Sequence, residues 1–224
     1  MIGIEDGEYA LKAGAYPQAF EIFMMLAGTG EDPAYYNLCS MVLNNQLNES
    51  QLQQLDDLLQ REASNGDKLA IYNLGIVYWR CSHARFKNLD KAAECLQRAS
   101  ALEVPEANVA LAKFYMADGS SNPMAKPDTI IHLLEQALDF GVIEAAYLLG
   151  RIFYDASYTA RDDSKAFVYL YIAAKQGHVE GKKALLLLQT LHQKNPFTSE
   201  IEKAREIMDN VEWNRGGFRQ PRAS

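Results

Sequence analysis

The stretch Ala70-Ile-Tyr-Asn-Leu-Gly-Ile-Val-Tyr78 decides the fold, because its pattern of residues returns along the chain about every 37 residues. Each copy begins with a small residue and has a leucine four residues later. In most copies another small residue follows that leucine directly. The small residues that begin the copies are Ala34, Ala70, Ala107, Ala145 and Gly181, and the leucines are Leu38, Leu74, Leu111, Leu149 and Leu185. A repeat of this length is typical of proteins that stack pairs of helices.

The residues within one copy indicate two helices, which we call helix A and helix B. Ala70, Leu74 and Tyr78 are four residues apart, so they lie on one face of helix A. Helix B also repeats, with alanines at the equivalent positions Ala99, Ala137 and Ala173. Two such helices cannot bury their apolar stripes alone. The sequence therefore predicts an all-α fold, a right-handed α/α superhelical solenoid of about six helical hairpins with helix A on the concave side.

Three copies, over residues 67–103, 105–141 and 143–178, resemble Sel1-like repeats, which are α/α-solenoid repeats related to the tetratricopeptide class. The family motif has an alanine, Leu-Gly and a tyrosine in helix A, then an aspartate, Lys-Ala and Ala-Ala-x-x-Gly in helix B. The third copy matches it best, with Ala145, Leu149, Gly150, Phe153, Asp162, Lys165, Ala166, Ala173, Ala174 and Gly177. The Gly-x-Gly loop of the family is missing from every copy. The resemblance implies a solenoid and, from what its members commonly do, an adaptor or assembly factor in bacteria.

The repeats and their flanks predict the domain organisation. We expect a single α/α-solenoid repeat domain over residues 1–212, in which helices over 182–212 cap the end of the stack with a polar outer face. Residues 213–224 contain three arginines and no acidic residue, which predicts a flexible basic tail. An RNA contact by this tail is an alternative that its single RGG-like stretch favours only weakly.

Composition narrows the classes of function. The chain has 224 residues and a formal net charge of −7, so it lacks the basic surface that nucleic acids require, and we expect no nucleic acid as its main partner. No run of about 18 apolar residues occurs, which predicts no membrane insertion. The acidic start lacks the features of a signal peptide, so the chain as written is expected in the cytoplasm, or exported if a leader was removed.

The residues that carry chemistry form no recognisable catalytic constellation. The four histidines fall in different repeats, and no His-Glu-x-x-His, Cys-x-x-Cys or Gly-x-Ser-x-Gly motif occurs. Cys81-Ser-His83 is the nearest approach to a nucleophile and base, but adjacent residues of a helix do not face each other. We therefore expect no catalytic residues, no cofactor and no metal site.

A partner-binding ridge is the sharper expectation. Residues two, six and nine positions after the small residue that begins helix A are rotated away from the buried stripe, and several are of types enriched at binding hot spots. The ridge consists of Tyr36, Tyr72, Ile76, Trp79, Lys113, Met116, Tyr147, Arg151 and Tyr154. Trp79 and Tyr147 are expected to be the most accessible. The competing interpretation is that these aromatic residues only pack against neighbouring A helices.

These observations favour a non-enzymatic protein–protein interaction module, an adaptor or scaffold that binds a partner protein or peptide through its concave face. One alternative is an immunity-type protein that neutralises a cognate toxin or effector, since negative charge would steer a basic partner. A hydrolase is the least favoured alternative, because no residue constellation supports it. Self-association through the groove or through an end of the stack is a further hypothesis.

Overall fold

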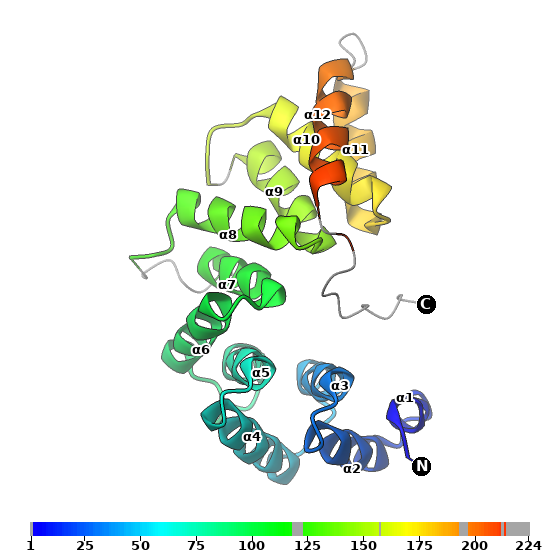
Figure 1. Cartoon of the computed structure of the whole chain (residues 1–224), viewed down its shortest axis with the longest axis vertical. Coiled ribbons are helices and arrows are strands. Elements are labelled where there is room, and N and C mark those ends of the chain that lie inside the picture. The colour runs from blue at the N-terminus through cyan, green and yellow to red at the C-terminus, as the bar shows by residue number, and fades with distance from the viewer. Residues whose placement is uncertain (1, 118–122, 157, 193–196, 212, 214–224) are drawn as a thin grey trace. The chain divides into compact units, whose positions relative to one another are not determined.

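A computed structural model describes residues 2–117, 123–156, 158–192, 197–211 and 213 of the chain. These residues form twelve α-helices and no strand (Figure 1), which confirms the all-helical prediction. The first six are α1 (Ile4–Lys12), α2 (Tyr16–Ala27), α3 (Asp32–Leu43), α4 (Glu49–Ser64), α5 (Lys68–Arg80) and α6 (Leu89–Ala101). The others are α7 (Pro105–Ala117), α8 (Pro127–Asp139), α9 (Ile143–Asp155), α10 (Asp163–Lys175), α11 (Val179–Leu191) and α12 (Thr198–Asn210).

The chain divides into two compact units, Met1–Leu111 and Ala112–Ser224, and the border between them falls within α7. Each unit is described by itself. A single domain over residues 1–212 stays a prediction. The basic tail predicted for 213–224 lies outside the described residues, apart from Trp213. No helix of the described part is long and apolar enough to cross a membrane.

The predicted repeat coincides with the helices in register. Each small residue that begins a copy is the third residue of its helix A, in α3, α5, α7, α9 and α11. The four alanines among them are wholly buried. The leucine four residues later is also buried in every copy except the last, where Leu185 is half-buried. Helices α3, α5, α7, α9 and α11 are therefore A helices, and the helix that follows each of them is its helix B.

Short polar side chains and left-handed residues set the ends of the helices. Asp67 begins α5 by accepting hydrogen bonds from the backbone amides of Leu69 and Ala70. Asn88 and Asp162 cap α6 and α10 in the same way. Gly177, with φ of 94°, follows α10 in the left-handed conformation that glycine adopts without strain.

In unit 1, α5 packs closely on its own helix B, α6. Gly75 of α5 lies so near α6 that a β-carbon there would be 3.0 Å from the Leu96 side chain. Helix α5 also packs against α3 and α4, so it is covered on several sides. Large side chains fill the remaining space, and Phe20, Phe23 and Tyr35 are almost fully buried.

In unit 2, α9 and α10 pack in the same close manner. A β-carbon at Gly150 would lie 2.6 Å from Cγ of Leu170, and the rings of Phe153 and Tyr169 stack 5.9 Å apart. The last helix pair differs, because α12 packs against α10, where the rings of Phe197 and Phe167 stack at 4.3 Å. The polar outer face expected of capping helices is not found on α11, which exposes several leucines.

Candidate partner-binding surfaces

Five residues of the predicted ridge belong to unit 2, at the end of α7 and along α9. Tyr147 is half-buried, and its ring stacks on the His178 ring at 4.4 Å with 22° between the planes. The Glu144 carboxylate forms an ion pair with Lys113 Nζ at 3.0 Å, and it lies 3.8 Å from His178 Nε2. Side chains from α7, α9 and the start of α11 thus meet on one surface around Tyr147.

The same surface continues along α9 toward its C-terminal end. Arg151 is exposed and pairs with Asp155, whose hydrogen bond raises the pKa of the guanidinium. The half-buried Tyr154 ring lies 4.7 Å from the Arg161 guanidinium, a cation–π contact. We call this set the α9 surface; it consists of Lys113, Tyr147, Arg151, Tyr154 and His178. Met116 is also half-buried, and its carbonyl accepts a hydrogen bond from the Tyr158 hydroxyl.

The other four ridge residues belong to unit 1, and two of them offer little surface. Tyr36 of α3 is 37% exposed, and Tyr72 of α5 is half-buried, with burial raising its pKa. Ile76 and Trp79 are buried, with 9% and 6% of their surface exposed. The expectation that Trp79 is among the most accessible residues is therefore corrected, because α5 is covered by helices on several sides.

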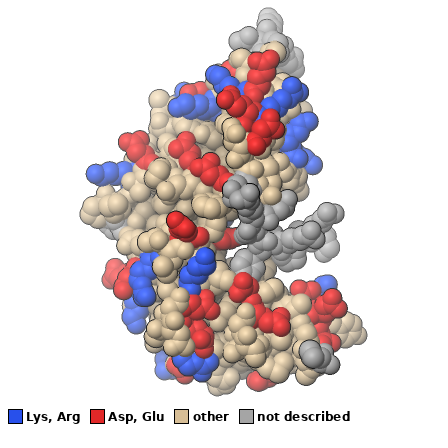
Figure 2. Space-filling model, in the orientation of Figure 1, with Lys and Arg blue, Asp and Glu red and all other residues tan. Residues whose placement is uncertain are grey.

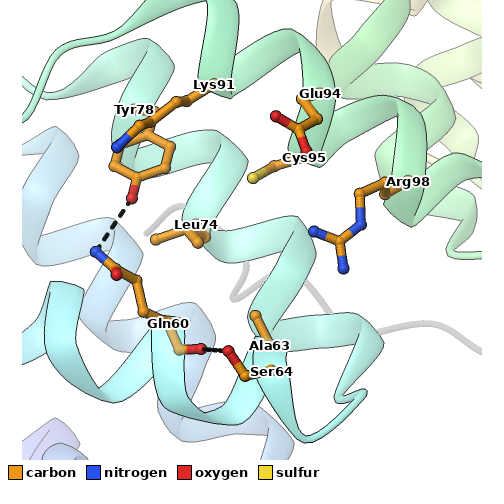
Figure 3. A pocket seen from close by; sticks show the side chains of 9 residues that line it. All are labelled: Gln60, Ala63, Ser64, Leu74, Tyr78, Lys91, Glu94, Cys95 and Arg98. Carbon is orange, nitrogen blue, oxygen red and sulfur yellow. Dashed lines mark hydrogen bonds between the residues drawn. The ribbon is translucent and has the colours of Figure 1, made fainter.

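Unit 1 also contains a pocket that sequence analysis did not single out (Figure 3). It has a volume of about 240 Å³ and lies between α4, α5 and α6. Lys91, Glu94, Cys95 and Arg98 line it from one face of α6, at the spacing of consecutive helical turns. That spacing is the signal that could have pointed to them. The other lining residues are Gln60, Ala63, Ser64, Leu74 and Tyr78.

A buried carboxylate lies one helical turn from this pocket. Asp56 of α4 is 7% exposed, and its Oδ2 accepts a hydrogen bond from Gln60 Nε2 at 2.6 Å. Its Oδ1 is buried and has no hydrogen-bond partner among the described residues. Burial raises the pKa of Asp56, while hydrogen bonds from Gln60 and Tyr78 and the charge of Lys91 oppose that rise.

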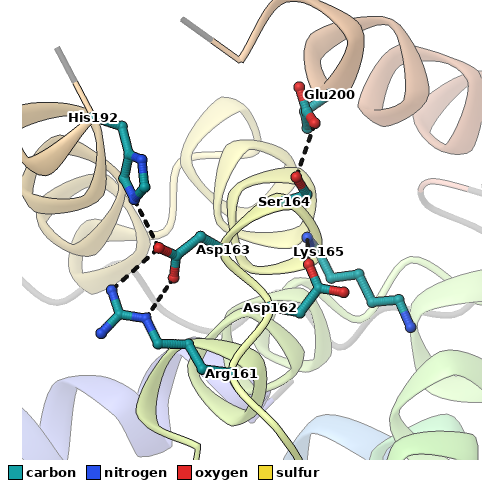
Figure 4. Close-up of polar contacts among 7 residues, drawn as sticks. All are labelled: Arg161, Asp162, Asp163, Ser164, Lys165, His192 and Glu200. Atoms are coloured by element: carbon teal, nitrogen blue, oxygen red, sulfur yellow. Dashed lines mark hydrogen bonds and ion pairs between the residues drawn. The ribbon is translucent and has the colours of Figure 1, made fainter. Parts of the chain in front are cut away.

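A polar cluster ties α10, α11 and the start of α12 together (Figure 4). The Asp163 carboxylate pairs with Arg161 at 2.6 Å and with His192 Nε2 at 2.7 Å, and these partners lower its pKa. Ser164 donates its hydroxyl to Glu200 and not to His192, so the cluster contains no nucleophile paired with a base. No group of three His, Cys, Asp or Glu residues in the described part could hold a metal ion.

Comparison with solved structures identifies the fold. The crystal structure of a Sel1 repeat protein from Oxalobacter formigenes aligns with 93% of this chain and 84% of its own, with a TM-score of 0.57 and 16% identity. The chain has the Sel1-like repeat fold. A protective antigen of uropathogenic Escherichia coli with an SLR fold, c5321, matches at a TM-score of 0.38 and 14% identity, over 92% of this chain and 52% of the antigen. No family model and no curated protein matches the sequence.

The structure gives physical reasons for the residues of the Sel1-like motif. The motif glycine beside the leucine lets helix B approach within contact distance, as Gly75 and Gly150 do. The motif lysine lies over the motif aromatic ring, with Lys91 Nζ 5.3 Å from the Tyr78 ring and Lys165 Nζ 5.0 Å from the Phe153 ring. The same contact occurs in the copies over residues 67–103 and 143–178. The Lys91 side chain in the pocket wall therefore serves the packing of the Sel1-like hairpin.

Proposed function

We propose that this protein is a non-enzymatic interaction module that binds a partner protein through the α9 surface. What supports the proposal is the stacked pair of Tyr147 and His178, which presents a half-exposed aromatic face held in place by its neighbour. A rigid aromatic side chain gives contact area at a low entropic cost, and tyrosine is enriched among binding hot spots. The Sel1-like repeat fold is in general a protein-interaction fold.

The charges of the α9 surface suit recognition more than catalysis. Lys113 and Arg151 are each already paired with a carboxylate, so the surface is nearly balanced in charge around its tyrosines. We expect a partner to place an apolar or aromatic side chain on the tyrosine rings and to hydrogen-bond their hydroxyls. In unit 1, Tyr36 and Tyr72 occupy the equivalent repeat position and form a second, smaller candidate contact.

The test is affinity capture from a lysate of the source cell with three forms of the chain. These are the wild type, the double variant Tyr147→Ala/Tyr154→Ala and the control Phe140→Ala, which removes an exposed aromatic ring elsewhere in unit 2. We expect a partner that the wild type and the control retain and the double variant loses, with circular dichroism showing that all three fold. Equal capture by the double variant would contradict the assignment of the surface.

A further inference from the structure

The pocket of unit 1 occurs at a place where the best-matching Sel1-like copy has a large aromatic side chain. Counted from the Lys-Ala pair of each motif, Cys95 of α6 corresponds to Tyr169 of α10. The Tyr169 ring stacks on Phe153 of α9 at 5.9 Å, and its hydroxyl donates a hydrogen bond to Glu135 of α8 at 3.1 Å. Tyr169 therefore lies between three helices of unit 2.

The equivalent space in unit 1 is open. Helices α4, α5 and α6 correspond to α8, α9 and α10, and the pocket of about 240 Å³ lies between them. Cys95, a much smaller residue than tyrosine, lines this pocket together with Tyr78, which corresponds to Phe153. Because a cavity of roughly 150 Å³ is large enough to hold benzene, the pocket has room for an aromatic ring with a short polar arm.

Two further positions of the pocket wall change from apolar to charged. Glu94 and Arg98 of α6 correspond to Val168 and Ile172 of α10, which are both buried. Together with Lys91, they give the wall on α6 two positive charges and one negative charge. Figure 2 shows blue side chains among red ones at the position of α6. The wall is therefore positive on balance, although the whole chain has a formal net charge of −7.

Arg98 is the charged group that a ligand can engage without breaking a contact of the fold. Within the described part of the chain, its guanidinium has no hydrogen bond and no ion pair. By contrast, Lys91 lies over the Tyr78 ring, and the Ser64 hydroxyl donates a hydrogen bond to the carbonyl of Gln60. An unpaired guanidinium at the edge of an apolar cavity favours a carboxylate, which accepts two parallel hydrogen bonds from it.

The spacing along α6 sets the length of the ligand. Figure 3 shows Tyr78 at one end of the pocket and the Arg98 guanidinium at the other, with Leu74 and Cys95 between them. Cys95 and Arg98 are three residues apart, which is a rise of about 4.5 Å along a helix. A ring that lies beside Cys95 therefore reaches Arg98 with a carboxylate on an arm of two carbons.

We propose that this pocket binds an aromatic ring that is joined by a two-carbon arm to a carboxylate. The ring takes the place that Tyr169 has in unit 2 and stacks on Tyr78, while the carboxylate pairs with Arg98. Glu94 on the same wall disfavours a ligand with a second carboxylate. This chemistry occurs in free arylpropionic acids and in peptides that end in phenylalanine. The site belongs to unit 1 and is separate from the α9 surface.

The first measurement is a calorimetric titration of the wild-type chain with phenylpropionate. We expect saturable binding with a Kd of about 1 mM or tighter, which is ordinary for a ligand of this size. Phenylpropionamide has the same shape without the charge, so it should bind at least about tenfold more weakly. The absence of saturable binding of phenylpropionate would overturn the proposal, and equal binding of the amide would overturn the role of the carboxylate.

Two variants test the place of the site. Cys95→Tyr puts the residue of unit 2 into the pocket and should abolish binding. Arg98→Gln should weaken phenylpropionate at least about tenfold and leave the amide unchanged. Arg85→Gln is the control, since it removes an exposed arginine of unit 1 that does not line the pocket.

Circular dichroism checks that the variants fold. Arg98 is exposed, so Arg98→Gln decides the question even if Cys95→Tyr fails to fold. Binding that survives both substitutions would overturn the proposal, because the ligand would then occupy another part of the chain.

Two short peptides that end in phenylalanine distinguish the sources of the ligand. One has a free C-terminal carboxylate, and the other is amidated. Tighter binding of the free peptide than of phenylpropionate would identify the ligand as the C-terminus of a protein, whereas weaker binding would identify it as a free aromatic acid. Equal binding of the two peptides would overturn the proposal, because the carboxylate would then contribute nothing.

Discussion

The helix pairs α9–α10 and α11–α12 are neighbours in unit 2, yet they bury their A helices to different extents. In α9, Leu149 is wholly buried and Gly150 lies against Leu170 of α10. At the equivalent positions of α11, Leu185 is half-buried and Leu186 is mostly exposed. The difference shows that the repeat pattern determines which helices are A helices, while the neighbouring helices decide whether their apolar side chains are buried.

The largest difference in stability loss is expected when the repeat leucine of each A helix, four residues after the small residue that begins the copy, is truncated to alanine. Leu149→Ala should lower the free energy of unfolding by about 3 kcal/mol, because it leaves a cavity in a packed interior. Leu185→Ala should lower it by about 1 kcal/mol, since this side chain is already half in water. Urea denaturation followed by circular dichroism measures both. Equal losses would show that α11 is as well covered as α9.

The next prediction concerns the residue directly after that leucine. Gly150→Ala should lower the free energy of unfolding by about 1–2 kcal/mol, because overlap of the new β-carbon with Leu170 outweighs the gain in helix propensity. Leu186→Ala, which creates the same residue at the equivalent position of α11, should change stability by less than about 0.5 kcal/mol. A stabilising effect of Gly150→Ala would show that α10 can move away at little cost.

A smaller contrast is expected at the helix starts. Asp162 accepts a hydrogen bond from the backbone amide of Lys165, so Asp162→Ala should destabilise the chain by about 1 kcal/mol. Helix α12 begins after Phe197, which offers no side-chain cap, and the nearby Ser199 hydroxyl bonds to Glu200 instead. Ser199→Ala should therefore change stability by less than about 0.5 kcal/mol. Thermal melts of both variants at equal protein concentration check this pair.

The smallest effect is expected from the polar cluster that joins α10 to α11, and it should depend on pH. Arg161 and then His192 lower the pKa of Asp163 in the folded state. The ionised carboxylate therefore stabilises the fold above the ordinary aspartate pKa of about 4, and this contribution is lost as pH falls through the lowered value. Asp163→Asn should lower the free energy of unfolding by less than about 1 kcal/mol at pH 7.

Urea denaturation over a pH series checks the sign of that effect. The stabilities of Asp163→Asn and the wild type should converge as the pH approaches 2, because the wild-type carboxyl is then protonated too. A gap between them that stays constant down to pH 2 would mean that the amide changes packing and that charge plays no part.

Much of the fold could be predicted because the repeat consists of particular residue types at short, fixed intervals along the chain. The position of Ala70 at the third residue of its helix, the cap at Asp162 and the close contact at Gly150 all follow from residue types at fixed intervals. The candidate site was less predictable. The rotation that places Tyr147 on a surface holds for Trp79 as well, but Trp79 is buried because other helices cover it. His178 was missed, since it stands outside helix A.

The sequence by itself determined the all-helical repeat, the register of its A helices and the positions where small residues let two helices meet. The helices and their register depend on interactions between residues a few positions apart, and the small residues recur at a fixed place in that register, so periodicity and capping express both directly. Only the tertiary structure decided which faces are covered. Tyr147 lies on His178, Trp79 is buried, and Leu186 is left in water because α12 packs on α10. Burial depends on which segment, distant in the sequence, packs against a given helix face, and no local pattern encodes that.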